Sequence, residues 1–224
     1  MNVLIYIITI LLFYGISFGG WELIVQNGVA PQWASIIVYA VLAVVYFLIH
    51  RKAIIERFKE FAPQLGDLSY IFIRLVLPMV LGVAGTYLLV YVMGSFFNVD
   101  ILPTNNENIK EIQAEIPHVI MFLYMVILGP IIEEIAFRES FFIWIPKEKK
   151  ALKALMTLLS IILFAAMHVD IFVEKAYEQI LYYIPLAIAL TYVYLQEDES
   201  FAASSVAHMI TNFIAFFAAL LGGI

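Results

Sequence analysis

The stretch GPIIEEIAFR, residues 129–138, places two adjacent carboxylates and an arginine inside an apolar run that extends from about Val119 to Pro146. A charged side chain at the centre of a lipid-spanning helix costs about 2.5–3.5 kcal/mol, so two glutamates together cost roughly 5–7 kcal/mol. Charged groups at such a depth must be paired inside the protein, protonated or in contact with a water-filled cavity. The stretch therefore predicts a buried polar site within a helical membrane protein.

The spacing within this stretch gives its two glutamates different surroundings. Glu134 and Arg138 are four residues apart, so they can pair along one helix face in the favourable order. Glu133 is rotated by about 100° and has Phe137, not a cation, four residues later. Pro130 cannot donate its backbone hydrogen bond, so we expect the helix to be opened or bent before Glu133. A packing salt bridge without catalytic meaning is the alternative reading of the pair.

The composition of the whole chain indicates a membrane protein. Of its 224 residues 64% are hydrophobic and only 13% charged, with a mean hydropathy of +0.97. A soluble domain is closer to half apolar and a quarter charged. The net charge of −6 and the lack of a basic cluster with interleaved aromatic residues give no sign of nucleic-acid binding. The absence of cysteine excludes a disulfide, a thiol nucleophile and a Cys-ligated zinc site.

We therefore predict an all-α fold, a polytopic bundle of about seven transmembrane helices in a single integral-membrane domain, residues 1–224. The core that carries the polar motifs covers about 118–224, and N-terminal helices cover about 1–95. Short amphipathic surface helices are expected at 50–61 and 104–116, where apolar residues recur on one face. The predicted spans are 3–25, 33–50, 68–94, 118–145, 153–170, 179–196 and 201–222.

Basic residues predict the orientation of these spans. The connectors 51–66 and 146–153 hold eight of the twelve Lys and Arg residues, whereas 96–117 and 170–178 hold two. Connectors rich in Lys and Arg stay in the cytoplasm. We therefore expect a cytoplasmic N-terminus.

Three further polar residues lie in predicted spans. His168 ends the fifth span, and His208 and Asn212 lie four residues apart in the seventh, so both can contact one cavity. A carboxylate, two imidazoles and an amide could together activate water and bind an oxyanion. Glu133, His168 and His208 could instead form a His₂Glu zinc set. A Gly-x-Ser-x-Gly elbow, a His-Glu-x-x-His helix and a glycine-rich phosphate loop are absent from the sequence.

Three polar motifs follow one another on successive predicted spans: Glu-Glu-x-x-x-Arg (Glu133, Glu134, Arg138), Phe-x-x-x-His (Phe164, His168) and His-x-x-x-Asn (His208, Asn212). In this order they resemble the motifs of the CAAX protease and bacteriocin-processing family. This abortive-infection family includes the Ras-converting CAAX endopeptidases. The resemblance covers about Gly129 to Asn212. It departs from the family at Glu139, where glycine is common, and an extra carboxylate there could change the local pairing or the cavity mouth.

The resemblance implies catalytic roles for four of these residues. Glu133 and His168 would activate a water molecule, and His208 and Asn212 would stabilise the oxyanion of the tetrahedral intermediate. Glu134 and Arg138 would support the helix and tune Glu133. Within the family both metal-free and zinc-dependent mechanisms have been described. We expect no cofactor, because Asn212 suits oxyanion binding better than zinc coordination, and keep zinc as the alternative.

The sequence thus predicts an intramembrane endopeptidase that cleaves a peptide or membrane-protein substrate near the membrane interface. Its partners would be that substrate and the lipid bilayer, without nucleic acid, and nothing in the sequence sets an oligomeric state. A bacterial cell membrane is the expected location. A non-catalytic membrane scaffold that retains the motifs is one alternative. A transporter or proton relay is another, although no pair of corresponding interrupted helices is found in two halves of the chain.

Overall fold

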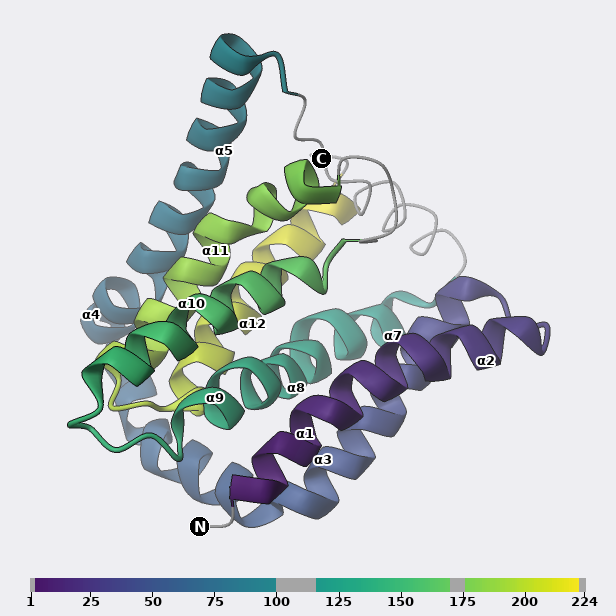
Figure 1. Cartoon of the computed structure of the whole chain (residues 1–224), viewed down its shortest axis with the longest axis horizontal. Coiled ribbons are helices and arrows are strands. Elements are labelled where there is room, and N and C mark those ends of the chain that lie inside the picture. The colour runs from purple at the N-terminus through teal and green to yellow at the C-terminus, as the bar shows by residue number, and fades with distance from the viewer. Residues whose placement is uncertain (1–2, 100–115, 170–175, 222–224) are drawn as a thin grey trace.

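The structure is a computed structural model that describes residues 3–99, 116–169 and 176–221, and all regular elements in these ranges are helical (Figure 1). Wider π-helical segments at 15–20, 71–76, 123–128 and 135–139 join several of the helices. The helices are α1 (Val3–Tyr14), α2 (Trp21–Gln26), α3 (Pro31–Phe61), α4 (Leu68–Tyr70), α5 (Leu77–Phe97), α7 (His118–Phe122), α8 (Gly129–Glu134), α9 (Ser140–Phe142), α10 (Lys150–Ala166), α11 (Ala176–Gln196) and α12 (Phe201–Leu220).

The predicted membrane bundle is confirmed. Among the described residues, six continuous helical stretches are long and apolar enough to cross a membrane: Val3–Gln26, Pro31–Gly66, Leu68–Phe97, His118–Phe142, Ala176–Gln196 and Phe201–Leu220. The fifth predicted span corresponds to α10, which has 17 residues and is therefore somewhat shorter than the usual length of about 20. The chain is an integral membrane protein, and the six long stretches together with α10 fit the expected number of about seven transmembrane helices.

The helix expected at 50–61 is present, but it is not separate from the preceding span. These residues continue α3, which runs for 31 residues from Pro31 to Phe61. Neither glycine nor an internal proline interrupts this stretch, so the helix has no reason to end at the membrane interface. His50 and Phe61 are buried against the bundle, whereas Ile55 is exposed. The second predicted surface helix, 104–116, falls almost entirely outside the described residues.

Small residues let α5 and α11 approach closely. A Cβ atom added to Gly82 would lie 2.8 Å from the Cβ of Ala189, and one added to Gly85 would lie 3.2 Å from the Cβ of Pro185. The Thr86 hydroxyl also donates to the Tyr182 carbonyl across this crossing, at 3.2 Å. Membrane helices pack through such small-residue contacts because lipid offers no hydrophobic drive for their association.

The helix that carries the two glutamates lies in the middle of the bundle. Ile132 and Phe137 are almost completely buried in one hydrophobic core to which α1, α3, α10, α11 and α12 contribute. Phe137 makes edge-to-face contacts with Phe13 of α1, at 5.0 Å between ring centroids, and with Phe164 of α10, at 5.7 Å. The core therefore fixes the depth and rotation of the segment that bears Glu133 and Glu134.

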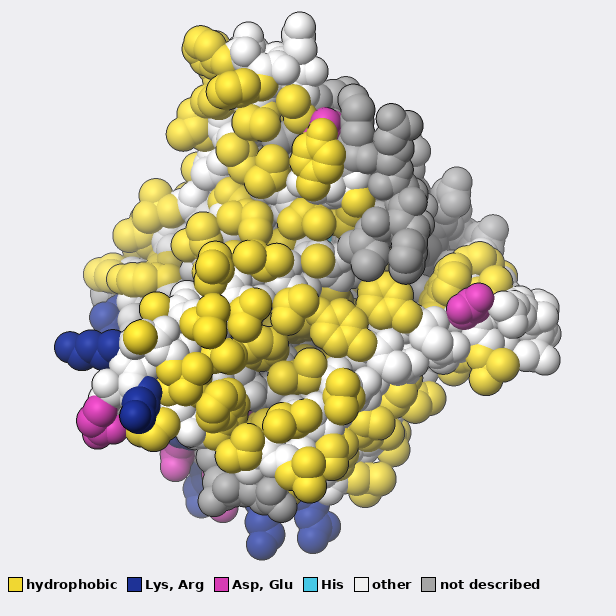
Figure 2. Space-filling view, in the orientation of Figure 1, with side chains coloured by type: hydrophobic (Ala, Val, Ile, Leu, Met, Phe, Trp, Pro, Cys, Tyr) yellow, Lys and Arg dark blue, Asp and Glu magenta, His cyan; other side chains and the backbone are white. Residues whose placement is uncertain are grey.

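The surface separates into an apolar body and one basic end. In Figure 2 hydrophobic side chains cover most of the visible face, whereas Lys and Arg gather at the end where the α9–α10 connection and the N-terminal end of α1 lie. Exposed Arg51, Lys52 and Lys59 of α3 and Lys147 and Lys149 before α10 belong to the connectors that were predicted to share one side. Such an arrangement is typical of a protein whose basic end contacts the cytoplasm.

Candidate active site

A disturbed helix presents the paired glutamates. The π-helical segment Leu123–Leu128 directly precedes Gly129 and Pro130, so the helix is widened before Glu133, as the proline predicted. A Cβ atom at position 129 would lie only 3.1 Å from the Tyr124 carbonyl oxygen and 3.7 Å from Glu133 Oε1. A side chain at this position would press on the widened backbone at Tyr124, so the Tyr124 carbonyl would have to shift by a few tenths of an ångström.

The predicted pair of Glu134 and Arg138 is confirmed. Arg138 Nη1 lies 3.2 Å from Glu134 Oε1, and both side chains are completely buried. The Arg138 guanidinium also stacks over the Phe164 ring, with 4.1 Å from Cζ to the ring centroid, and Nη2 donates to the Ala187 carbonyl at 3.4 Å. Arg138 thus contacts Phe164 of α10 and Ala187 of α11 in addition to Glu134 of α8. Its positive charge compensates the buried Glu134 carboxylate, which would be strongly destabilising without a partner.

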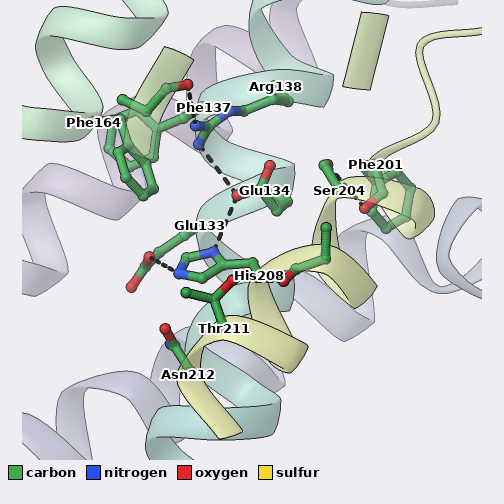
Figure 3. A network of polar contacts seen from close by, with 12 residues as sticks. Glu133, Glu134, Phe137, Arg138, Phe164, Phe201, Ser204, His208, Thr211 and Asn212 are labelled. Carbon is green, nitrogen blue, oxygen red and sulfur yellow. Dashed lines mark hydrogen bonds and ion pairs between the residues drawn. The ribbon is translucent and has the colours of Figure 1, made fainter. Parts of the chain in front are cut away.

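His208 links the two glutamates (Figure 3). Its Nδ1 lies 3.2 Å from Glu134 Oε1 and its Nε2 lies 3.9 Å from Glu133 Oε2. The first distance allows a hydrogen bond, whereas the second is too long for a direct one. Arg138, Glu134, His208 and Glu133 therefore form a continuous series of charged or ionisable groups, with Glu133 at its end. Helix spacing alone did not predict that His208 would join both carboxylates.

The second histidine is oriented by its own helix. His168 Nδ1 lies 2.8 Å from the Phe164 carbonyl oxygen, which can only accept, so Nδ1 carries the proton. The neutral ring then presents a lone pair at Nε2. Tyr183 stacks on the ring with 4.7 Å between centroids and an interplanar angle of 25°. These contacts hold His168 with an acceptor nitrogen available, which suits either a base or a metal ligand.

Asn212 is anchored to the widened part of the glutamate helix. Its Nδ2 donates to the Met125 carbonyl at 2.9 Å. A side-chain amide has two donor hydrogens, so this contact uses one of them and leaves a second for another acceptor. The π-helical segment thereby positions both the start of α8 and the amide of α12.

One cavity of about 390 Å³ brings the predicted catalytic residues together. It is lined by Glu133 of α8, His168 just after α10, and His208 and Asn212 of α12. Glu134 and Arg138 lie behind this lining. The other walls include seven aromatic side chains: Phe13, Phe18, Trp21, Tyr39, Tyr124, Tyr182 and Tyr183. Four polar groups from three parts of the chain thus converge on a largely apolar chamber, as expected for a ligand or substrate site.

The alternative zinc set of Glu133, His168 and His208 stays a prediction. Among the described residues, no group of three or more His, Cys, Asp or Glu side chains already has the arrangement of a metal site. His208 Nδ1 contacts Glu134 Oε1 at 3.2 Å, and its Nε2 lies 3.9 Å from Glu133 Oε2. A carboxylate bound to one ring nitrogen leaves the other nitrogen available, so this contact is compatible with either an oxyanion donor or a metal ligand.

Tyr39 is a contact of Glu133 that sequence reasoning missed. Its hydroxyl donates to Glu133 Oε1 at 2.9 Å, from α3, which is 94 residues away in sequence. A tyrosine in an apolar span carries no local signal of such a contact, because the contact depends on how α3 packs against α8.

Glu139 lies away from the cavity. Its side chain is buried, and the Tyr194 hydroxyl donates to Glu139 Oε2 at 3.4 Å. It is not part of the cavity lining. The extra carboxylate therefore does not contribute to the cavity walls.

Comparison with protein families finds a match over the part of the chain that carries the polar motifs. Residues 115–214 match the family model described as type II CAAX prenyl endopeptidase Rce1-like. This range contains Glu133, Glu134, Arg138, His168, His208 and Asn212, and excludes α1 to α5. No curated protein and no solved structure matches the chain.

Proposed function

We propose that this membrane protein, which matches the Rce1-like CAAX endopeptidases over residues 115–214, is a glutamate-dependent intramembrane endopeptidase. The observation that carries the proposal is the convergence of Glu133, His168, His208 and Asn212 on one cavity. The family match independently implies a CAAX-type endopeptidase. The substrate we propose is a peptide or membrane-protein segment near the interface, and the location we propose is a bacterial cell membrane.

The proposed reaction starts with a water molecule in the cavity. Glu133 accepts a proton from this water, assisted by the lone pair of His168 Nε2, while the water oxygen attacks the carbonyl carbon of the scissile peptide. The carbonyl oxygen becomes an oxyanion. When the tetrahedral intermediate collapses, the C–N bond breaks and the proton passes from Glu133 to the leaving amine. Proton and charge are therefore balanced without a covalent enzyme intermediate.

His208 and the second amide hydrogen of Asn212 are suited to binding the oxyanion. With both ring nitrogens of His208 protonated, Nδ1 donates to Glu134 and Nε2 is a donor at the cavity wall. Glu133, Glu134, Arg138 and His208 then carry two negative and two positive charges, so the buried group is neutral as a whole. Preorganised donors of this kind contribute about 10²–10³ in rate for each donor.

A comparison of cells tests the proposed function. Peptides in membranes and medium are quantified by mass spectrometry in cells that carry the wild type, Glu133→Ala or an empty vector. We expect a set of cleavage products that depends on the wild type and disappears with Glu133→Ala. A phenotype that Glu133→Ala retains, with no lost product, would instead support the scaffold alternative.

Chelation tests the metal-free form of the mechanism. Because the amide of Asn212 and the orientation of His208 suit oxyanion binding, we expect purified wild-type protein to keep its activity after zinc chelation. Activity that is abolished by the chelator and restored by zinc would favour the His₂Glu alternative of Glu133, His168 and His208.

A further inference from the structure

We propose that Tyr39 is a positioning residue for Glu133, supplied by a part of the chain outside the family match. The inference rests on the proposed function, in which Glu133 takes a proton from water. Tyr39 belongs to α3, whereas the family match begins at residue 115. The site would thus be incomplete without the N-terminal helices, although all the motif residues lie in the C-terminal half.

The two oxygens of Glu133 have different partners. Oε1 accepts a hydrogen bond from the Tyr39 hydroxyl at 2.9 Å, and Oε2 lies 3.9 Å from His208 Nε2. The last torsion of a glutamate is broad and nearly two-fold, so packing alone does not fix which oxygen points where. A donor on one oxygen and an imidazole opposite the other remove this freedom. The contact with Tyr39 therefore selects Oε2 as the oxygen that takes up the proton.

Neighbouring residues hold the Tyr39 ring in place. It makes an edge-to-face contact with Tyr124, with 5.0 Å between centroids and an interplanar angle of 83°. A Cβ atom at Gly129 would lie 3.8 Å from Tyr39 Cε1 and 3.7 Å from Glu133 Oε1. The contact between the Tyr39 hydroxyl and the Glu133 carboxylate thus lies beside Gly129, which has no side chain. Tyr124, Gly129 and Glu133 belong to one widened helix, and the Tyr39 ring of α3 packs against this helix.

A phenol suits this task better than a cation. A neutral donor orients the carboxylate through a charge-assisted hydrogen bond but leaves its negative charge in place, which a base requires. When Oε2 receives a proton, Oε1 becomes the carbonyl oxygen of the acid and can still accept from Tyr39. The same hydrogen bond therefore holds Glu133 before and after proton transfer.

Two matched tyrosine variants test the inference. Tyr39→Phe removes only the hydroxyl that contacts Glu133. Tyr46→Phe removes a hydroxyl from the same helix, where it donates to the Thr9 carbonyl at 2.6 Å within the buried core and away from the cavity. The substrate is the parent of a peptide whose release in cells is abolished by Glu133→Ala, and rates are expressed per folded molecule in lipid vesicles.

The inference predicts a change in kcat and not in KM. Tyr39→Phe should lower kcat about 10- to 100-fold, the usual effect of a misplaced reacting group, with KM within about twofold of the wild type. Tyr46→Phe should lower the melting temperature at least as much as Tyr39→Phe while kcat is retained. Wild-type kcat in folded Tyr39→Phe, when Glu133→Gln is inactive, overturns the inference but not the proposed function.

A double variant distinguishes positioning from substrate contact. Glu133→Asp shortens the side chain by one methylene group and withdraws its oxygens from Tyr39, so adding Tyr39→Phe should lower kcat by less than twofold further. A full additional loss would show that Tyr39 acts on the substrate and would overturn the inference. If Glu133→Gln cleaved the substrate at the wild-type rate, the proposed function would be contradicted, and the inference about Tyr39 would be contradicted as well.

Discussion

At the residue scale, the site is organised as a series of charges that ends at the cavity wall. Arg138 neutralises Glu134, and His208 connects Glu134 to Glu133 (Figure 3). Glu134 and Arg138 are completely buried, while Glu133 reaches the cavity. The Glu134–Arg138 pair thus has a structural role, and the Glu133 carboxylate remains available for the proposed reaction.

Removal of Arg138 should therefore reduce folding as well as activity. Arg138→Ala leaves Glu134 buried without its guanidinium partner and empties the space over Phe164. Breaking a buried pair typically costs about 3–5 kcal/mol. We expect a lower yield of folded protein and a lower melting temperature, measured by size-exclusion chromatography and thermal unfolding in detergent. A normal yield of stable but inactive Arg138→Ala would instead place Arg138 in the chemistry.

At the element scale, the widened helix is what makes the site possible. Pro130 and Gly129 lie between two π-helical segments, 123–128 and 135–139, and the first of these segments also supplies the Met125 carbonyl that holds Asn212. An uninterrupted α-helix would rotate Glu133 and Met125 differently relative to α12. The backbone geometry before Glu133 therefore sets where the Glu133 carboxylate lies relative to the side-chain amide of Asn212.

Helix-level features were only partly predictable from sequence. The i, i+4 spacing predicted the Glu134–Arg138 ion pair, and Pro130 predicted that the helix is opened before Glu133. The bridge through His208 and the hydrogen bond from Tyr39 depend on how three helices pack, which local spacing does not encode. His168 follows the end of α10, but the bundle brings it to the same cavity as Glu133. The helix at 50–61 was predicted, but its continuity with the preceding span was not, because amphipathic spacing does not mark where a helix begins.

Glycine 129 provides an element-scale test. Gly129→Ala places a methyl group 3.1 Å from the Tyr124 carbonyl oxygen, so it should lower the melting temperature and the cleavage rate. Gly19→Ala is the stability control, because a Cβ atom there has no heavy atom within 4 Å. In the control the alanine should keep or raise the melting temperature, since glycine inside a helix costs about 0.5–1 kcal/mol. Equal melting temperatures for the two variants would contradict the close approach at Gly129.

At the scale of the whole molecule, the two halves of the chain share one core. Phe13 of α1 and Phe137 in the segment after α8 pack edge to face, and Tyr39 of α3 contacts Glu133. The family match covers the half that holds the motif residues. The N-terminal helices contribute walls to the cavity through Phe13, Trp21 and Tyr39.

The orientation in the membrane is a prediction for the whole molecule. The basic connectors predict that residues 147–149 lie in the cytoplasm. The turn between α2 and α3, which contains Asn27, lies at the other end of the bundle from the α9–α10 connection (Figure 1) and should therefore lie on the opposite side of the membrane. The chain has no cysteine, so single cysteines can be introduced without background labelling. We expect a membrane-impermeant maleimide to label Asn27→Cys in intact cells and Lys149→Cys only after permeabilisation. Labelling of both from the same side would refute the orientation.

The central claim is that Glu133 is the base that activates water. Glu133→Gln keeps the size of the side chain and can still accept from Tyr39, but it removes the base and one buried charge. The direct measurement is kcat of purified wild type and Glu133→Gln in lipid vesicles, with a parent peptide identified in the cell comparison as substrate. We predict a folded variant whose kcat is lower by about 10²-fold or more. Cleavage by folded Glu133→Gln at the wild-type rate would contradict the account.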